Sequence, residues 1–503
     1  MLGVAAKQSE LLIAATEFPR PSRLMALATL AHCVLWSVGP ALVIGNLHAD
    51  TLEAIYWGTD WALGYGKHPP IATWLFDAAV ALGFAPILCV MILSQATVAL
   101  TSFFVWRTLR LYQNERTAAL AVLLYLASPA ATFYAVQANH NSVLAPFWAA
   151  CCFFGLRYLE ERRARDAIAL GVIAGLGLMT KYEILFILAS LVLAAALVPR
   201  FRDAFRRPAS YLSVGLMFCV ASPHIWWLAH HGWPSVDRAL GVDKVVSIET
   251  LNTSAVNALV GQFTLFAMPG LVLLCVSAWR RESDLPVRRS GARIGALLAL
   301  APSLILFAGA AATYQIIKPL WVLPLSSTAA IGLALMVPAD DFGRARPFAV
   351  AIVIASPLIL LGFFAYLFVA DAIGRPLPAY EPQARVLAEA VQAEWSAHRK
   401  SPVACIVIAE RKLGPSPLLW LKPMPKVVDY SSGFWHTPAQ IAQCRKTGAV
   451  IVDGSGDHEA QKLYAPACIL DDRVIKVPAR FSLHGATWPM ELAYVPPQGQ
   501  PCP

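Results

Sequence analysis

The sequence predicts a polytopic α-helical membrane protein with a small soluble domain at its C-terminal end. Three observations predict this fold class: the 503-residue chain is 57% hydrophobic, only 14% of its residues are charged, and its long apolar runs stop near residue 370. The mean hydropathy is +0.57. A soluble protein of this length has too little interior to bury so many apolar side chains.

Apolar runs of roughly 20 residues are long enough to cross a bilayer, and the chain contains about eleven of them. The first, from Leu24 to Ile44, is long enough to act as an uncleaved anchor, and no cleavable signal peptide is evident. The expected spans are 24–44, 86–106, 117–135, 142–158, 167–181, 183–199, 211–228, 257–279, 294–312, 319–338 and 348–370.

Arginines gather in alternate connections between these spans. The Arg-rich connections lie at 107–116, 157–165, 200–207, 280–293 and 344–346. By the positive-inside rule they are cytoplasmic, which places the other face of the molecule outside. That outer face includes the loop His48–Pro70 and the tail after Asp371. Because membrane orientation accounts for the net charge of +9, the basicity does not call for a nucleic-acid partner.

The chain divides into a membrane domain at 1–370 and a soluble domain at 371–503. In the tail, 385–399 and 440–447 have helical patterns, whereas 403–409 and 449–452 are apolar runs typical of buried strands. This alternation predicts a small α/β domain. The tail also holds four cysteines, and an outer location permits disulfides without fixing the pairs. They are Cys405, Cys444, Cys468 and Cys502.

The outer loop His48–Pro70 concentrates charged and aromatic side chains in an otherwise apolar chain. Ionisable groups are costly beside hydrocarbon, so their clustering here indicates a site. Asp50 and Glu53 are spaced i, i+3 and share one face of a helix, which suits a catalytic pair. The same spacing also fits a capping box with Asp50 as N-cap and Glu53 at N3.

Aromatic rings accompany these acids. Trp57 and Tyr65 can stack on a sugar or anchor at the lipid interface. The loop ends at Lys67-His68-Pro69-Pro70, and proline in the first turn predicts a helix that begins after it and lies along the membrane surface.

Other outer connections add polar groups that suit substrate binding: Asn139, Asn141 and Tyr182. Lysines are scarce on this face, and an ammonium group binds phosphate as a point charge. The candidate phosphate ligands are therefore Lys67, Lys181 and Lys318, with His68 beside them, although Glu183 is a competing structural partner for Lys181.

A divalent metal held by oxygen and imidazole ligands is permitted by ligand chemistry, although no local spacing requires it. The four residues that could supply such ligands are His48, Asp50, Glu53 and His140. No metal or other cofactor is otherwise indicated.

The order of these features resembles the clan of membrane glycosyltransferases that contains the protein O-mannosyltransferases and the aminoarabinose transferases. The segments that carry the resemblance are the acidic first outer loop, GYGKHPP (64–70), LGLMTKYEILF (176–186), SPHIWWLAHHGW (222–233) and IKPLWVLPL (317–325). The resemblance implies the GT-C fold, a periplasmic active site in a bacterial inner membrane, a polyprenyl-phosphate sugar donor, and lipid A or another envelope glycan as acceptor.

Under this resemblance Asp50 is the catalytic base and Glu53 assists it. The chain departs from the common pattern in two places, because Thr51 follows Asp50 where many members have an adjacent Glu, and Asn141 stands where many have an acid. Both departures place more of the chemistry on Asp50.

Two functions of other classes compete with a transferase. A transporter or lipid flippase usually places charges and broken helices near the bilayer midplane, often in related repeats, whereas here the charges gather at one face and no repeat is visible. A non-catalytic envelope scaffold is the second alternative. An Asp50→Asn variant that folds but is inactive would count against it.

Overall fold

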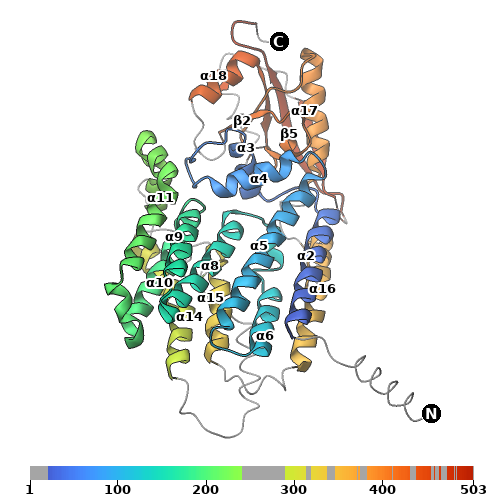
Figure 1. Cartoon of the computed structure of the whole chain (residues 1–503). Helices are drawn as coiled ribbons and strands as arrows, with labels where there is room; N and C mark the ends of the chain where they lie inside the picture. The colour runs from blue at the N-terminus through green and yellow to red at the C-terminus, as the bar shows by residue number, and fades with distance from the viewer. Residues whose placement is uncertain are drawn as a thin grey trace, which may run out of the picture.

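The computed structural model describes most of the chain outside its first twenty residues. The described residues are 21–240, 256, 289–312, 319–336, 346–370, 372–373, 382–410, 412–430, 438–454, 458, 464–465, 473–480, 482 and 484–501. Within them the chain forms a bundle of apolar helices with a mixed α/β domain at one end (Figure 1). The expected helical membrane domain and small C-terminal sheet domain are both present.

The helices of the bundle follow the apolar runs of the sequence. They are α2 (Pro21–Val43), α3 (Ala49–Gly58), α4 (Ile71–Ala81), α5 (Pro86–Leu109), α6 (Glu115–Leu126), α7 (Phe133–Val136), α8 (His140–Glu161), α9 (Ala164–Leu178), α10 (Ile184–Leu197), η1 (Pro199–Arg206), α11 (Pro208–His231), α12 (Pro234–Leu240), α14 (Arg289–Ala312), η2 (Pro319–Val322), α15 (Leu325–Met336) and α16 (Arg346–Val369).

Each expected span overlaps helix except 257–279, which lies outside the described residues, and the expected span 319–338 is divided between η2 and α15. Among the described helices, five are long and apolar enough to cross a membrane, or six if the bent pair α10 and η1 counts as one span. The expected span 117–135 is interrupted, because α6 ends at Leu126 and a turn containing Pro129 precedes the short α7. Pro129 has no amide hydrogen to donate within a helix, and the break falls there, although α2, α8, α11, α14 and α16 each continue through a proline.

Small residues allow the helices to approach closely. Along α9, Gly171 and Gly175 face α11, and a Cβ atom at Gly171 would lie 2.4 Å from the Ser213 carbonyl oxygen. Gly295 of α14 and Gly332 of α15 meet in the same way, with a Cβ at Gly295 only 2.6 Å from the Gly332 carbonyl. Close backbone contact of this kind replaces hydrophobic burial as the source of helix association in lipid.

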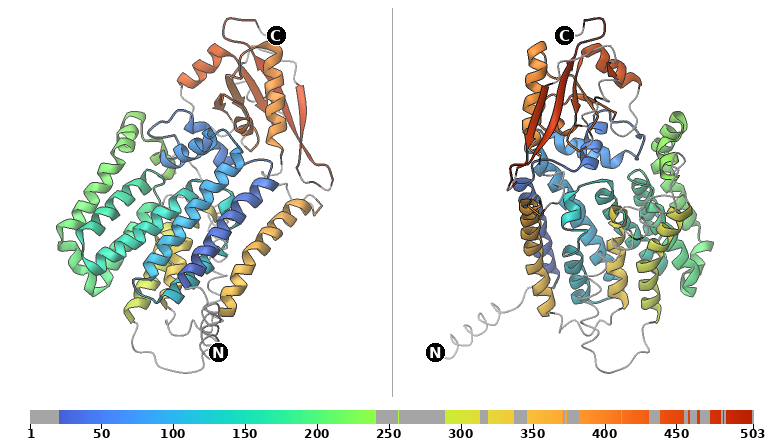
Figure 2. Two further views of the ribbon diagram at one scale, coloured as in Figure 1. Left: turned by 45° about the vertical axis from the view of Figure 1, so that its right-hand side comes forward. Right: turned by 180° about the vertical axis from the view of Figure 1, so that it is seen from behind.

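The Arg-rich connections 107–116, 157–165 and 200–207 lie at the end of the bundle away from the C-terminal domain (Figure 1). Two of them are joined: Arg162 of the loop before α9 pairs with Asp203 of η1 at 2.7 Å, and Arg207 of the same connection as Asp203 pairs with that carboxylate at 2.9 Å. At the other end, α4 lies across the bundle between the membrane helices and the C-terminal domain (Figure 2). The helix expected after Pro69-Pro70 therefore forms and caps the bundle.

The C-terminal domain is a five-stranded sheet with helices beside it. Its elements are α17 (Ala384–His398), β1 (Cys405–Ile408), η4 (Ser416–Leu419), β2 (Lys426–Asp429), α18 (Pro438–Thr447), β3 (Ala449–Asp453), β4 (Arg473–Pro478) and β5 (Thr487–Val495). The strand order is β2-β1-β3-β5-β4. β1 pairs in parallel with β2 and β3, whereas β5 runs antiparallel to β3 and β4.

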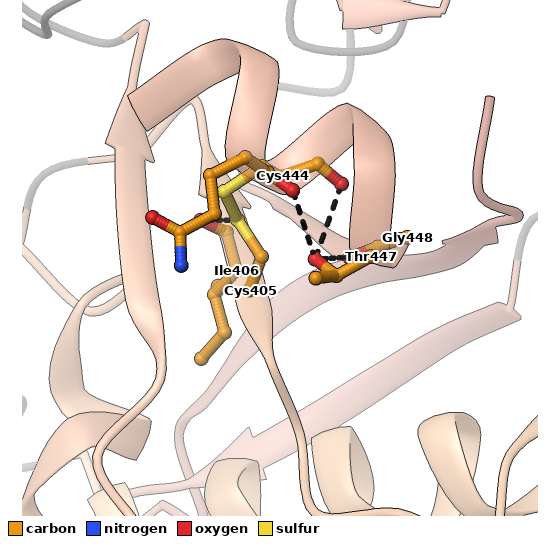
Figure 3. Close-up of a disulfide and its surroundings, with 6 residues drawn as sticks. Cys405, Ile406, Cys444, Thr447 and Gly448 are labelled. Atoms are coloured by element: carbon orange, nitrogen blue, oxygen red, sulfur yellow. Dashed lines mark hydrogen bonds between the residues drawn. A yellow bond between two sulfur atoms is a disulfide. The ribbon is translucent and has the colours of Figure 1, made fainter. Parts of the chain in front are cut away.

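A disulfide fastens one helix of this domain to an inner strand of its sheet. Cys405 of β1 bonds to Cys444 of α18 across a sequence separation of 39 (Figure 3). This assigns one of the pairings that the sequence left open, while Cys468 and Cys502 lie outside the described residues.

Candidate active site

A single cavity of about 360 Å³ collects most of the polar residues that the sequence singled out. Its polar wall comes from the start of α3, the loop before α4, the start of α8, the α9–α10 junction and the end of α12. Its apolar wall comes from α10, α14 and η2, through Leu185, Phe186, Leu306, Ala310 and Leu320. The polar residues that line it are Asp50, Lys67, His68, Asn139, His140, Asn141, Lys181, Tyr182, Glu183 and Arg238.

Asp50 lies in the first turn of α3 with its carboxylate on the cavity. The N-cap of this helix is His48, whose Nδ1 accepts a hydrogen bond from the Asp50 backbone amide at 3.2 Å. The capping-box alternative, in which Asp50 itself is the N-cap, is therefore wrong. The Asp50 side chain is 28% exposed, and its Oδ1 lies 3.9 Å from the Lys67 ammonium. A carboxylate in this position can reach a substrate in the cavity.

Glu53 lies one turn further along α3 and is almost completely buried, at 1% exposed. Lys67 Nζ donates a hydrogen bond of 2.8 Å to its Oε1. Glu53 is absent from the lining of the cavity, so it holds Lys67 from behind while Lys67 itself lines the cavity. Of the two acids, Asp50 therefore lines the cavity, whereas Glu53 holds Lys67 in place.

Lys181 enters the cavity from the junction of α9 and α10. Its Nζ donates to Asn141 Oδ1 at 2.8 Å and pairs with Glu183 Oε1 at 2.6 Å. It also lies 5.2 Å from the centre of the Trp321 ring. The structure therefore contains the Glu183 partner that sequence reasoning offered as the alternative, and it places that pair on the cavity wall. An ammonium group held by three elements is fixed in place for contact with an anion.

The rings of His68 and His140 pack against each other in the cavity wall, tilted by 33° with their centroids 4.0 Å apart. Burial, and next the charge interactions with His140, Lys67 and other cations, hold the pKa of His68 well below its ordinary value of 6.5. His68 is therefore neutral at physiological pH, and a neutral imidazole can both donate and accept a hydrogen bond.

Asn139 and Tyr182 also have structural partners at the cavity. The Asn139 side chain caps α8 by accepting from the Asn141 amide at 2.9 Å. Tyr182 Oη forms hydrogen bonds to His224 Nε2 at 2.8 Å and to Ser235 Oγ at 2.6 Å. These bonds fix both side chains at the rim where a substrate would lie.

Two predicted substrate-binding aromatics are placed elsewhere. Trp57 and Tyr65 stack on each other with centroids 5.8 Å apart and are 5% and 4% exposed. Both belong to an apolar cluster shared with the C-terminal domain rather than to the cavity lining. Lys318 lies outside the described residues.

Arg238, at the end of α12, is a cavity residue that sequence reasoning missed. It lies in an outer connection that is poor in Lys and Arg, so the reasoning that selected the outer lysines would also have selected this arginine. The possible metal ligands His48, Asp50, Glu53 and His140 do not assemble, because the described residues contain no group of three or more His, Cys, Asp or Glu side chains placed to hold a metal ion.

Comparison with known proteins adds sequence and structural relatives. Residues 67–227 match the family model described as dolichyl-phosphate-mannose-protein mannosyltransferase. The lipid A galacturonosyltransferase RgtD of Rhizobium johnstonii is 25% identical over 189 residues, which cover 37% of this chain and 39% of that protein. The lipopolysaccharide core galacturonosyltransferase RgtB of the same organism is 25% identical over 209 residues, covering 40% and 41%. The alignments thus span about two fifths of these relatives.

The structural likeness extends over nearly the whole chain. The crystal structure of ArnT from Cupriavidus metallidurans in the apo state matches with a TM-score of 0.61 and 15% identity, covering 94% of this chain and 98% of that one. The structure of the same protein bound to undecaprenyl phosphate matches with a TM-score of 0.60 and 13% identity, over the same shares of the two chains. The chain therefore has the ArnT fold, and together these matches confirm its resemblance to the GT-C glycosyltransferases of the protein O-mannosyltransferase and aminoarabinose-transferase clan.

Proposed function

We propose that this protein transfers a sugar from a polyprenyl-phosphate donor to lipid A or to another glycan of the bacterial envelope. One observation carries the proposal. The Asp50 carboxylate and the Lys67 and Lys181 ammonium groups line a single cavity that is also lined by apolar side chains of α10, α14 and η2. Such a cavity suits a substrate that joins a phosphate to a long hydrocarbon chain.

In the proposed reaction an acceptor hydroxyl oxygen attacks the anomeric carbon of the donor sugar. Asp50 accepts the hydroxyl proton, and the bond from the anomeric carbon to the phosphate oxygen breaks with its electron pair on the polyprenyl phosphate. Attack opposite the leaving group inverts the anomeric configuration. General-base assistance of this kind is worth about 10²–10⁴-fold in rate.

Cationic side chains stabilise the departing phosphate, where negative charge develops in the transition state. Lys67 and Lys181 have this role, and Arg238 lines the same cavity. Lys318 is proposed as a further phosphate ligand. Glu53 keeps Lys67 in place through its 2.8 Å contact.

The neutral and amide side chains at the rim are proposed to bind the sugar and the acceptor. They are His68, Asn139, Asn141 and Tyr182. Trp57 and Tyr65, which the sequence suggested as sugar-stacking residues, are assigned instead to the packing of the C-terminal domain, because both lie in that apolar cluster.

The cavity is proposed to open on the periplasmic side of the inner membrane. Helix α3, which contributes Asp50 to its wall, lies at the end of the bundle that carries the C-terminal domain, opposite the Arg-rich connections 107–116, 157–165 and 200–207 (Figure 1). The positive-inside rule assigns the Arg-rich end to the cytoplasm. The C-terminal domain is then periplasmic, a compartment in which the Cys405–Cys444 disulfide is stable.

The relatives guide the choice of substrates to test. A solved structure with this fold is bound to undecaprenyl phosphate, and the two curated relatives are named as galacturonosyltransferases of lipid A and of the lipopolysaccharide core. A galacturonosyl group on a polyprenyl phosphate is therefore the first donor to test, with lipid A and core oligosaccharide as acceptors.

Mass spectrometry of envelope lipids tests this function in cells. A deletion strain should lack one glycosyl residue on lipid A or core, and a plasmid copy of the wild-type chain should restore it. A copy carrying Asp50→Asn should not restore it. Asp203→Asn, which makes the same change at the opposite end of the bundle, should restore it. Identical lipid and glycan profiles in the deletion and wild-type strains would overturn the transferase proposal and favour a transporter.

A further inference from the structure

Helix α3 lies beside the C-terminal domain (Figure 1) and also contributes to the cavity lining. Its first turn contributes Asp50 to the cavity wall. Its last turn contributes Tyr56 and Trp57 to an apolar cluster that includes Leu387, Val391 and other residues of the C-terminal domain. One short helix therefore connects the proposed base with the soluble domain.

The last turn of α3 also forms a buried polar contact with the sheet. Tyr56 Oη donates a hydrogen bond of 2.8 Å to Asp429 Oδ2. Asp429 is the last residue of β2 and is 2% exposed, and Tyr56 is 5% exposed. A buried carboxylate requires such donors, because removing one leaves the charge less well solvated at considerable cost. The contact therefore fixes α3 more strictly than apolar packing alone.

Segments on both sides of α3 are held by the same domain. Before the helix, the Gly45 carbonyl accepts from the Ala384 amide at 3.2 Å, and Asn46 Nδ2 donates to the Lys412 carbonyl at 3.2 Å. After the helix, Lys426 donates to the Thr59 carbonyl at 3.2 Å. Thr59 and Tyr56 thus contact opposite ends of the same strand, β2, through Lys426 and Asp429.

From these contacts we infer that the C-terminal domain positions the catalytic helix, and that the Tyr56–Asp429 hydrogen bond sets the location of the Asp50 carboxylate. The inference rests on the proposed function, in which Asp50 is the base. Tyr56 and Asp429 are positioning residues, because neither lines the cavity. The soluble domain is then a required part of the active site rather than a separate acceptor-binding module.

Helix geometry gives the size of the expected effect. Six residues separate Tyr56 from Asp50, or about 9 Å at 1.5 Å per residue. A tilt of about 6° at the last turn therefore moves the first turn by about 1 Å. A displacement of that size can reduce the rate about a hundredfold when it misplaces a reacting group. The part of the site proposed to bind the donor should move less, because Lys181 and Asn141 belong to elements other than α3.

The test compares three variants of the full-length protein purified in detergent: Tyr56→Phe, Asp429→Asn and the control Tyr494→Phe. The control loses a hydrogen bond of similar length, in which Arg399 Nε donates to Tyr494 Oη at 2.9 Å, and that bond lies wholly within the C-terminal domain. Steady-state kinetics with a polyprenyl-phosphate galacturonosyl donor give kcat and KM. Hydrogen exchange followed by mass spectrometry reports on peptides that cover residues 49–58.

Tyr56→Phe and Asp429→Asn should each reduce kcat by about ten- to a hundredfold, with the donor KM within about threefold of wild type. Both substitutions should increase the rate of amide hydrogen exchange in α3. The double variant should have a kcat no lower than that of the more impaired single variant, because the two substitutions remove the same hydrogen bond. Tyr494→Phe should leave kcat and α3 exchange unchanged.

Wild-type kcat and exchange in a folded Tyr56→Phe protein would overturn the inference, as would an equal loss of kcat in Tyr494→Phe. If the wild-type protein transfers no sugar from any donor, the proposed function fails instead. The exchange measurement then still decides whether this hydrogen bond positions α3.

Discussion

The buried Lys67–Glu53 pair gives a quantitative prediction about stability. The Lys67→Met substitution leaves the Glu53 carboxylate, at 1% exposure, without the ammonium that lies 2.8 Å away. Removing one partner of a buried pair typically costs about 3–5 kcal/mol. Because the carboxylate can take up a proton instead, the penalty at pH 7 is limited to the free energy of protonating a glutamate in water, about 3.7 kcal/mol.

Glu53→Gln should cost less, about 2–3 kcal/mol. In this variant Lys67 still has the Asp50 carboxylate as a charged partner at 3.9 Å, and the Lys67 side chain, at 13% exposed, retains some contact with solvent. The double variant Glu53→Gln/Lys67→Met removes both charges and should lie within about 1 kcal/mol of wild type. At pH 5 the limit on the Lys67→Met penalty falls to about 1 kcal/mol, so the stability deficit of this variant relative to wild type at the same pH should shrink as the pH is lowered.

Unfolding of the detergent-solubilised protein at pH 7 and pH 5, for the wild type, both single variants and the double variant, checks this reasoning. Arg385→Met is the control, because Arg385 and Glu389 form an exposed pair with side chains 71% and 65% accessible. Its loss should change stability by less than about 1 kcal/mol. A double variant that is less stable than either single variant would refute the account of this pair.

Three further predictions concern the cavity, the disulfide and pH. Lys181→Met should lower kcat/KM for the donor by about 10²–10³-fold in steady-state assays, and wild-type values would exclude a phosphate role. Cys405→Ser/Cys444→Ser should reduce the unfolding free energy of the C-terminal domain by about 3–4 kcal/mol, and an unchanged denaturation midpoint in the full chain would contradict this. Because the pKa of His68 is lowered by burial, the unfolded chain binds more protons there, so stability is lost as the pH falls below 6.5. If the Tm of His68→Gln falls with decreasing pH as steeply as the Tm of the wild type, His68 is not the source of this pH dependence.

Apolar runs and periodicity were enough to predict most of the helical architecture. They failed at the expected span 117–135, where the alanine-rich sequence around Pro129 is apolar but does not continue the helix. In the C-terminal domain, strands β1 and β3 were predicted because they are continuous apolar runs buried on both faces. Strand β4 was missed because its residues are largely exposed, and β5 because it contains Pro489.

The candidate site was predictable as a set of residue types but not as an arrangement. Charged residues at the outer ends of apolar runs identified Asp50, Lys67 and Lys181, which share the cavity. No local pattern could show that Lys181 meets Asn141, forty positions away in the sequence, or that Glu53 faces Lys67 rather than the cavity.

The aromatics show the same limit most clearly. Trp57 has the chemistry of a sugar-stacking residue, yet it is buried against the C-terminal domain. The residues of that domain in its apolar cluster lie more than three hundred positions later in the sequence. Sequence position alone cannot distinguish a ring that faces substrate from one that faces another domain.

Single-turnover transfer by purified Asp50→Asn protein tests the central claim most directly. With a polyprenyl-phosphate galacturonosyl donor and lipid A acceptor, the account predicts a loss of about 10²–10⁴-fold in the rate of transfer, while binding of the donor is retained. Asp203→Asn protein, measured in parallel, should react at the wild-type rate. Transfer by Asp50→Asn protein at the wild-type rate would contradict the assignment of Asp50 as the base.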